Sequence, residues 1–209
     1  MTLHFLAPEN KDNWHPIWDK CFNTWVKSTH NLNVWTDKGI DKLLQEDDKE
    51  FYEEYLKKLN PIYKFDYVRY LILEKYGGAY IDMDIELVND FFPLLDSNSI
   101  YLAEGTSGNY VENCMMISSN IRHNCPIFFE RIKDFCKDRI KLNYNKCLQD
   151  KRQVLYNVGA KALSEFIVTQ QQFFSVNINR LSYEHFGSLK NTLSFTKHHY
   201  SNSWLKINN

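Results

Sequence analysis

The sequence lacks the features that are typical of several common classes of protein. Its five cysteines are an odd number and include no Cys-x-x-Cys pair, which argues against both a disulfide framework and a zinc site. No stretch of about 18 uninterrupted apolar residues occurs, so no membrane span is expected. The N-terminus has no charged start followed by a long apolar run, and therefore no visible secretory signal. These absences predict a cytoplasmic protein with reduced thiols, in a bacterium or, if the chain is viral, in its host.

The charged residues are balanced, which excludes partners that bind through charge of one sign. The chain has 25 basic and 26 acidic residues, for a formal net charge of −1. This balance predicts neither a nucleic-acid groove nor a polybasic membrane anchor. A length of 209 residues suffices for one globular domain with a sizeable core. Because no linker is visible, we expect a single domain over residues 1–209. The sequence leaves its oligomeric state open.

Hydrophobic spacing alternates between strand-like and helix-like along the chain. This alternation predicts an α/β fold with a central, mostly parallel sheet flanked by helices. The charged residues 37–59 predict one or two surface helices, and the strongly polar residues 137–152 indicate a mobile insertion. Strands are expected at residues 2–7, 31–36, 79–81, 99–104, 112–118, 173–177 and 193–198. The main helices are expected at residues 14–28, 61–76, 126–135 and 158–168.

Two carboxylates, Asp82 and Asp84, follow the strand expected at residues 79–81. Side chains two residues apart in an extended chain point the same way, so these two lie side by side. Neighbouring carboxylates repel each other unless a positive charge lies between them. A hard divalent cation, Mg²⁺ or Mn²⁺, is the usual partner, and it commonly completes its shell with phosphate oxygens. The pair therefore predicts a metal site that faces a phosphate-containing ligand.

The helix before this strand carries a second charged pair. Asp66 and Arg69 are three residues apart and share one face of the helix. Taken alone, such a pair is typical of a surface salt bridge worth about 0–1 kcal/mol. Gly77-Gly78 predicts a helix C-cap that packs closely against the next strand. Ligands of open α/β sheets bind at the carboxyl ends of the strands. The block therefore directs Asp66, Arg69 and Asp82 toward one crevice.

The whole block resembles the signature of glycosyltransferases of the GT-A fold that have a DXD-containing sugar-binding region. In that family an Asp-x-x-Arg helix runs into Tyr-Gly-Gly-x-Tyr-x-Asp-x-Asp. The family includes yeast-type initiating mannosyltransferases, bacterial capsular polysaccharide transferases and, more distantly, the clostridial glucosylating toxins. The matching residues are Asp66, Arg69, Tyr76, Gly77, Gly78, Tyr80, Asp82 and Asp84. The resemblance implies a Rossmann-like nucleotide-diphospho-sugar transferase fold.

Two later segments also resemble this family. Residues 112–116 are similar to the segment that follows the metal strand. His198-His199-Tyr200, followed by Ser203-Trp204, resembles the closing His-His-aromatic-x-x-Ser-Trp of the family. A histidine there is implied as a nitrogen ligand to Mn²⁺, with His199 the first choice and His198 the second. Ser203 and Trp204 are implied to close over the diphosphate as a lid.

The resemblance implies a role for each carboxylate of the central block. Asp84 is the implied direct metal ligand. Asp82 is implied to contact the ribose hydroxyls of the donor and to reach the metal directly or through water. Asp66 and Arg69 are implied to hold hydroxyls of the donor sugar. All four are the candidate catalytic residues.

The nucleotide is implied to lie around the same strand. Tyr80 and Gly78 are the implied binding residues there, and residues 6–8 are expected beside the base. The implied cofactor is Mn²⁺ or Mg²⁺, and the implied donor is a UDP-sugar, with a GDP-sugar as the other possibility. The acceptor is a hydroxyl of a glycan or glycoconjugate, and the family retains the configuration at the anomeric carbon.

Two other classes of function compete with this interpretation. One is a catalytically silent module that binds a sugar nucleotide or glycan with the same fold. The presence of both aspartates, Arg69 and His199 argues against it. The other is a Mg²⁺-dependent phosphohydrolase or nuclease, which needs further carboxylates such as Glu86 and Asp90. A phosphohydrolase or nuclease does not account for the Ser203-Trp204 ending.

Overall fold

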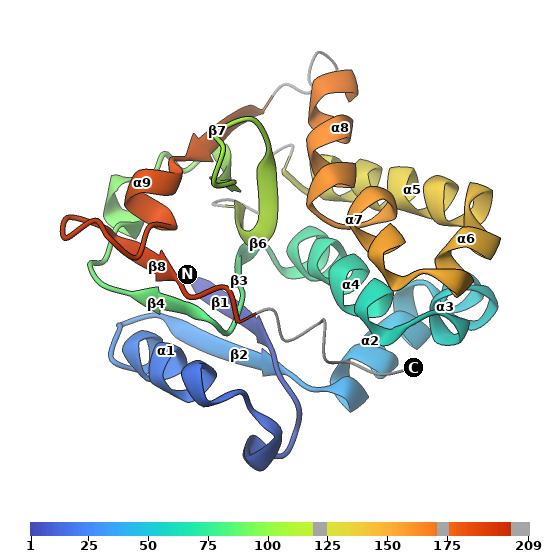
Figure 1. Ribbon diagram of the computed structural model, residues 1–209, viewed down its shortest axis with the longest axis horizontal. Helices are drawn as coiled ribbons and strands as arrows, with labels where there is room; N and C mark the ends of the chain where they lie inside the picture. The colour runs from blue at the N-terminus through green and yellow to red at the C-terminus, as the bar shows by residue number, and fades with distance from the viewer. Residues whose placement is uncertain (119–124, 171–175, 202–209) are drawn as a thin grey trace.

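A six-stranded sheet forms the centre of the computed structural model, which describes residues 1–118, 125–170 and 176–201 (Figure 1). The strands follow the order β2 (Asn31–Trp35), β1 (Thr2–Leu6), β3 (Gly78–Ile81), β6 (Val111–Ser118), β5 (Ser99–Glu104) and β7 (Asn177–Leu181). Three of the pairings are parallel, and only β6 runs against its two neighbours. The expected mostly parallel α/β sheet is confirmed.

Helices cover both faces of the sheet, with most of them on one side (Figure 1). That side carries α2 (Asp37–Asp47), α3 (Lys49–Glu54), α4 (Pro61–Tyr76), α5 (Cys125–Leu142), α6 (Tyr144–Gln149), α7 (Val154–Asn157) and α8 (Ala160–Gln170). The other side carries α1 (Pro16–Val26), α9 (Tyr183–Phe186) and a small antiparallel sheet of β4 (Ile85–Leu87) and β8 (Thr196–His198). Short 3₁₀ turns occur at Lys11–Asn13, Leu56–Lys58, Phe92–Leu94 and Lys151–Gln153. None of the described helices is long and apolar enough to cross a membrane.

The alternation of side chains along the strands divides the core into two clusters. On β3, Tyr80 packs with the helices of the α4 side, while Ala79 and Ile81 pack on the α1 side. On β6, Met116 and Ile117 divide in the same way. Because side chains of a strand alternate between the two faces, Asp82 leaves β3 on the same side as Tyr80. This places Asp82 above α4 and not above α1.

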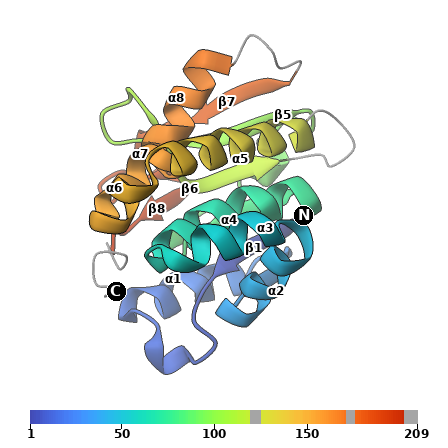
Figure 2. The same cartoon turned by 90° about the vertical axis from the view of Figure 1, so that its right-hand side faces the viewer.

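Helix α4 lies in the middle of the larger helical layer, where it packs against β3, β6 and the neighbouring α5 (Figure 2). It begins at Pro61, where the side chain of Asn60 accepts a hydrogen bond from the Ile62 N–H at 3.2 Å. Large aromatic side chains such as Tyr63 and Tyr70 are completely buried along it. The helix is buried on most of its circumference, so the Asp66–Arg69 pair lies inside the protein. The interpretation of this pair as a surface salt bridge is therefore wrong.

The Gly77-Gly78 break lets β3 begin directly against β1. Gly78 has a φ of +80°, and a Cβ there would lie 2.2 Å from the backbone oxygen of Thr2. Only glycine tolerates both the backbone conformation and this close approach. Gly78 starts β3, whereas Asp82 follows its end, and Gly78 is not among the residues that line the pocket described below. The predicted role of Gly78 in nucleotide binding is therefore corrected to one in packing.

Two charged segments fold into helices, and the expectation about one of them is corrected. Residues 137–152 do not form a loose insertion, because α5 continues to Leu142 and α6 follows at once. Within this polar run Ile140 and Cys147 are buried. Residues 37–59 form surface helices as expected, and these bury an apolar face that includes Leu44 and Phe51. In both segments a few apolar side chains at helical spacing are enough to bind the helix to the core.

Candidate active site

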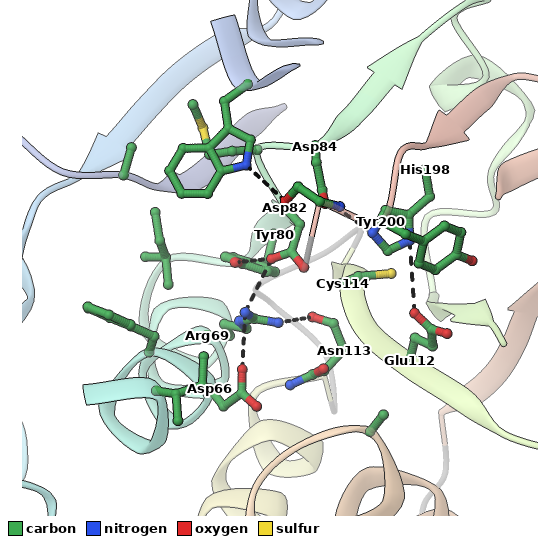
Figure 3. Close-up of a pocket in the computed structure, with 18 of the residues that line it drawn as sticks. Asp66, Arg69, Tyr80, Asp82, Asp84, Glu112, Asn113, Cys114, His198 and Tyr200 are labelled. Carbon is green, nitrogen blue, oxygen red and sulfur yellow. Dashed lines mark hydrogen bonds and ion pairs between the residues drawn. The ribbon is translucent and has the colours of Figure 1, made fainter. Parts of the chain in front are cut away.

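A cavity of about 790 Å³ opens at the carboxyl ends of β1, β2 and β3. Residues that follow these strands line it, as does the start of the antiparallel β6, which reaches the same edge. Residues 6–8, which are expected beside the base of the nucleotide, are in its wall. Asp66, Arg69, Tyr80, Asp82 and Asp84 all line this cavity (Figure 3). The sequence block thus converges on one site.

Arg69 links Asp66 of the same helix to Asp82 of the aspartate pair. Its Nη2 atom lies 3.0 Å from Asp66 Oδ1 and 3.3 Å from Asp82 Oδ1 (Figure 3). Its Nη1 atom donates a hydrogen bond to the backbone oxygen of Asn113 at 3.0 Å, and the guanidinium lies over the Tyr80 ring, 4.8 Å from its centre. The buried Nε atom has no hydrogen-bond partner in the described part of the chain. Arg69 is therefore held in place by its other contacts, and its Nε–H remains available to a ligand.

Burial and neighbouring charges shift the pKa values of Asp82 and Asp84 in opposite directions. Burial raises the pKa of Asp82 to about 6, and the nearby Asp84 adds to this, although Arg69 opposes it. The Tyr80 hydroxyl donates a 2.5 Å hydrogen bond to Asp82 Oδ1. Burial also disfavours the charged form of Asp84, but hydrogen bonds from His198 and Ser201 outweigh it and lower the pKa of Asp84 to about 2. Asp84 thus keeps its negative charge at any ordinary pH. An added positive charge would stabilise the charged form of Asp82 most, because burial disfavours that form.

A turn after β3 brings the two aspartates together. The backbone N–H of Asp82 donates to the Cys114 oxygen of β6 at 2.8 Å, which extends the β3–β6 pairing by one residue. The Ile85 N–H then donates to the Asp82 oxygen at 3.1 Å and closes the turn that contains Asp84. Asp82 is therefore fixed by the large sheet, and Asp84 by the turn into β4.

The segment over residues 196–201 completes the site from far along the chain. Strand β8 pairs with β4 so that His198 lies opposite Ile85. The Ser201 N–H donates to Asp84 Oδ2 at 2.7 Å, across 117 residues of sequence, and the His199 N–H donates to the Asp84 backbone oxygen at 2.9 Å. Trp18 of α1 donates to the Ser201 hydroxyl at 3.3 Å. These contacts attach the segment to both Asp84 and α1.

His198 faces the aspartate pair, and His199 does not. His198 Nε2 lies 3.3 Å from Asp84 Oδ1, and the Tyr200 ring stacks on the imidazole with 3.8 Å between ring centres. His199 Nε2 instead lies 2.8 Å from Glu86 Oε2. Successive residues of an extended segment point in opposite directions, so only one of two adjacent histidines can reach the site. The order of preference between the two is corrected in favour of His198.

The donor set of the site fits a divalent cation. One ligand atom each from Asp82, Asp84 and His198 lies within 4.8 Å of the others. Carboxylate oxygens suit Mg²⁺ or Mn²⁺, and an imidazole nitrogen favours the transition metal of the two. Burial raises the pKa of Asp82, so the charged form of this carboxyl is disfavoured in the metal-free protein. A cation within reach of both carboxylates would stabilise that charged form.

Some site residues were not assigned from sequence, and others cannot be placed. Ser203 and Trp204 lie outside the described residues. Tyr200, which stacks on His198, and Glu112, which approaches the same ring, received no role in the sequence analysis. Tyr200 could have been identified as a site residue from its place directly after the two histidines. For Glu112 the only indication was its place in a segment that resembles the family.

Comparison with known proteins matches the central block of the sequence to a glycosyltransferase region. Residues 13–101 match the model of the glycosyltransferase sugar-binding region containing DXD motif. Mannosyl phosphorylinositol ceramide synthase CSH1 of Saccharomyces cerevisiae is 31% identical over 122 residues, which cover 58% of this chain and 31% of that protein. Inositol phosphoceramide mannosyltransferase 1 of Schizosaccharomyces pombe is 36% identical over 69 residues, which cover 33% of this chain and 22% of that protein. The chain thus matches less than a third of the length of these relatives.

One solved structure shares the fold. The PaToxG glycosyltransferase superposes with a TM-score of 0.51 at 17% sequence identity, covering 81% of this chain and 68% of that one. At such low identity the similarity concerns the fold alone. The matched region contains the Asp66–Arg69 helix and the Asp82–Asp84 pair, which converge on the pocket. Residues 13–101 thus match a glycosyltransferase sugar-binding region containing a DXD motif, in a chain whose fold is similar to that of a GT-A glycosyltransferase.

Proposed function

We propose that this chain is a metal-dependent glycosyltransferase. It transfers a sugar from a nucleotide-sugar donor to a hydroxyl of a glycan or glycoconjugate acceptor, with retention of configuration. The observation that carries the proposal is the meeting of Asp82, Asp84 and His198 in a pocket that also holds the Asp66–Arg69 pair. The three candidate metal ligands can hold a cation that binds phosphate, and the neighbouring Asp66–Arg69 pair can bind hydroxyls. Together they match the diphosphate and the sugar of a nucleotide-sugar donor.

The chemistry assigns a separate task to each half of the pocket. A bound divalent cation supplies positive charge where the leaving diphosphate develops negative charge. Asp84, with its pKa lowered to about 2, is the constant anionic ligand, and Asp82 and His198 complete the set. Asp66 and Arg69 orient the hydroxyls of the sugar, and the free Arg69 Nε supports such a contact. Holding the sugar and the diphosphate rigidly lowers the entropic part of the barrier.

The names of the relatives suggest which sugar and acceptor to test first. They are described as a mannosyl phosphorylinositol ceramide synthase and an inositol phosphoceramide mannosyltransferase. We therefore propose transfer of a hexose, with mannose as the first candidate. A UDP-sugar stays our predicted donor class, with a GDP-sugar as the alternative. Polysaccharide biosynthesis or protein glycosylation in the cytoplasm stays the predicted context.

A screen of donor hydrolysis tests the proposal. The protein is incubated with a panel of UDP- and GDP-sugars, mannosyl donors included, with Mn²⁺, with Mg²⁺ and with a chelator, and release of free nucleotide is measured. We expect release from one donor class only, dependent on metal and lost in Asp84→Asn. Nucleotide binding that is equal with and without metal, and unaffected by Asp84→Asn, would exclude a transferase. Metal-dependent binding without turnover of any donor, even with glycan or glycolipid acceptors added, would indicate the silent binding module.

A further inference from the structure

Glu112 approaches the metal-site histidine from the side opposite Asp84. Its Oε2 atom lies 3.9 Å from His198 Nδ1, while Asp84 Oδ1 lies 3.3 Å from His198 Nε2 (Figure 3). Its other oxygen, Oε1, accepts a hydrogen bond from the Tyr110 hydroxyl at 3.2 Å. The Glu112 side chain is only 15% exposed. A largely buried carboxylate is costly unless it interacts with a donor or a positive charge.

The imidazole needs such a partner if it is to bind a cation through Nε2. In the neutral ring only one nitrogen carries hydrogen, so a metal on Nε2 requires the hydrogen on Nδ1. That N–H is buried with the ring and must find an acceptor. Histidines that bind metals commonly donate their second N–H to a carboxylate, which sets both the tautomer and the angle of the ring. Tyr200 stacks on the face of the ring and leaves its edge to Glu112.

We propose that Glu112 is a positioning residue for the metal site. It accepts the Nδ1 hydrogen of His198 and so directs Nε2 toward Asp82 and Asp84. The inference rests on the proposed function, because it assumes that a cation binds there. A movement of about 1 Å converts the present 3.9 Å approach into a hydrogen bond. A small rotation of the His198 ring would be sufficient for such a movement.

Mn²⁺ binding to the intact protein tests this directly. Free Mn²⁺ is titrated by electron paramagnetic resonance against wild type, Glu112→Gln, Glu112→Ala, His198→Ala and the double variant. Loss of a carboxylate that orients a ligand costs about 10–100-fold in metal affinity, so Glu112→Ala should fall in this range. Glu112→Gln should lose less, because its amide oxygen still accepts a hydrogen bond. Glu104→Ala is the matched control, since Glu104 lies on the neighbouring strand β5 and does not line the pocket.

The double variant separates positioning from a general effect of charge. If Glu112 acts through His198, Glu112→Ala has no further effect once His198 is alanine. An equal loss of Mn²⁺ affinity in both backgrounds would overturn the inference. A loss of Mn²⁺ affinity in Cys114→Ser without a loss in Glu112→Gln would also overturn the inference. Cys114 is the third member of a Glu112–Cys114–His198 group and would then be the residue that supports the metal. Thermal melting of the metal-free variants confirms that each is folded.

The outcomes also distinguish this inference from the proposed function. If wild type binds Mn²⁺ and Asp84→Asn abolishes binding while Glu112→Ala changes nothing, only the role of Glu112 is wrong. If wild type does not bind Mn²⁺ at all, with or without nucleotide, the metal dependence of the proposed function fails as well. The ratio of Mg²⁺ to Mn²⁺ affinity gives a second readout. It should shift toward Mg²⁺ in Glu112→Ala, because Mg²⁺ depends less on an imidazole ligand.

Discussion

The two halves of the pocket are assembled in different ways. The half around Arg69 comes from α4 and the end of β3, which are adjacent in sequence, and both are buried in the main core. The half around His198 depends on β8, a strand of three residues that pairs with β4. The contact of His199 with Glu86 spans 113 residues of sequence, and that of Ser201 with Asp84 spans 117. The half proposed to bind the sugar is therefore local and deeply buried, whereas the half proposed to bind the metal depends on a small long-range sheet.

The comparison predicts that the Arg69 half matters most for stability. In Arg69→Ala, Asp66 and Asp82 lose their shared positive partner while remaining buried. Removing one member of a buried charge network costs about 3–5 kcal/mol in the free energy of unfolding. Denaturant unfolding should show this loss, together with loss of donor turnover. Arg139→Ala, which removes the partner of an exposed Glu165, is the control and should cost far less.

The metal half should matter most for turnover. Asp84→Asn removes the permanent negative charge of the metal set and keeps the shape of the side chain. We expect kcat/KM for donor hydrolysis to fall by about 10²–10³-fold, the usual cost of losing one group that supports charge in a transition state. Unfolding free energy should change less than in Arg69→Ala. Asp134→Asn, on an exposed part of α5, provides the control. If Asp84→Asn retained full turnover, the difference between the halves would disappear.

Asp82 belongs to both halves, and its titration is the next test. The folded protein holds the Asp82 proton up to about pH 6, whereas the ordinary aspartate pKa of the unfolded chain is 3.8. Between these values the folded state binds more protons, so the unfolding free energy of the metal-free protein falls as pH rises. Asp82 should contribute a fall of about 1–3 kcal/mol across this window. Denaturant unfolding at pH 4–7 should show this component in wild type and not in Asp82→Asn.

The smallest effect is expected for the second histidine. His199→Ala removes a partly exposed ion pair with Glu86, which is worth about 0–1 kcal/mol. Mn²⁺ affinity should stay within about twofold of wild type, while His198→Ala should lose most of it, as binding titrations of the two variants can show. A larger loss of Mn²⁺ binding in His199→Ala would return His199 to the metal site.

Much of the fold and half of the site were predictable because their signals are local. The strands at residues 2–7, 31–36 and 99–104 and the helix from Pro61 follow from the spacing of apolar side chains. The Asp66–Arg69 pair followed from helical spacing, but its burial did not, because a helix that is buried on nearly all sides has no polar face to mark its orientation. The ordered helices within residues 137–152 were missed since a few buried side chains outweigh a polar composition.

Local sequence patterns suffice to predict that α4, the glycine break and β3 deliver two aspartates to a sheet edge. Helical and strand periodicity and the special backbone of Gly78 act over a few residues, so they can be read along the chain. The packing of distant segments selects the histidine that joins Asp82 and Asp84, and it brings Glu112 to the far side of that ring. That choice depends on the register of β4 against β8, since a shift of one residue would exchange His198 for His199. Register is set by packing between distant segments, which local sequence does not encode.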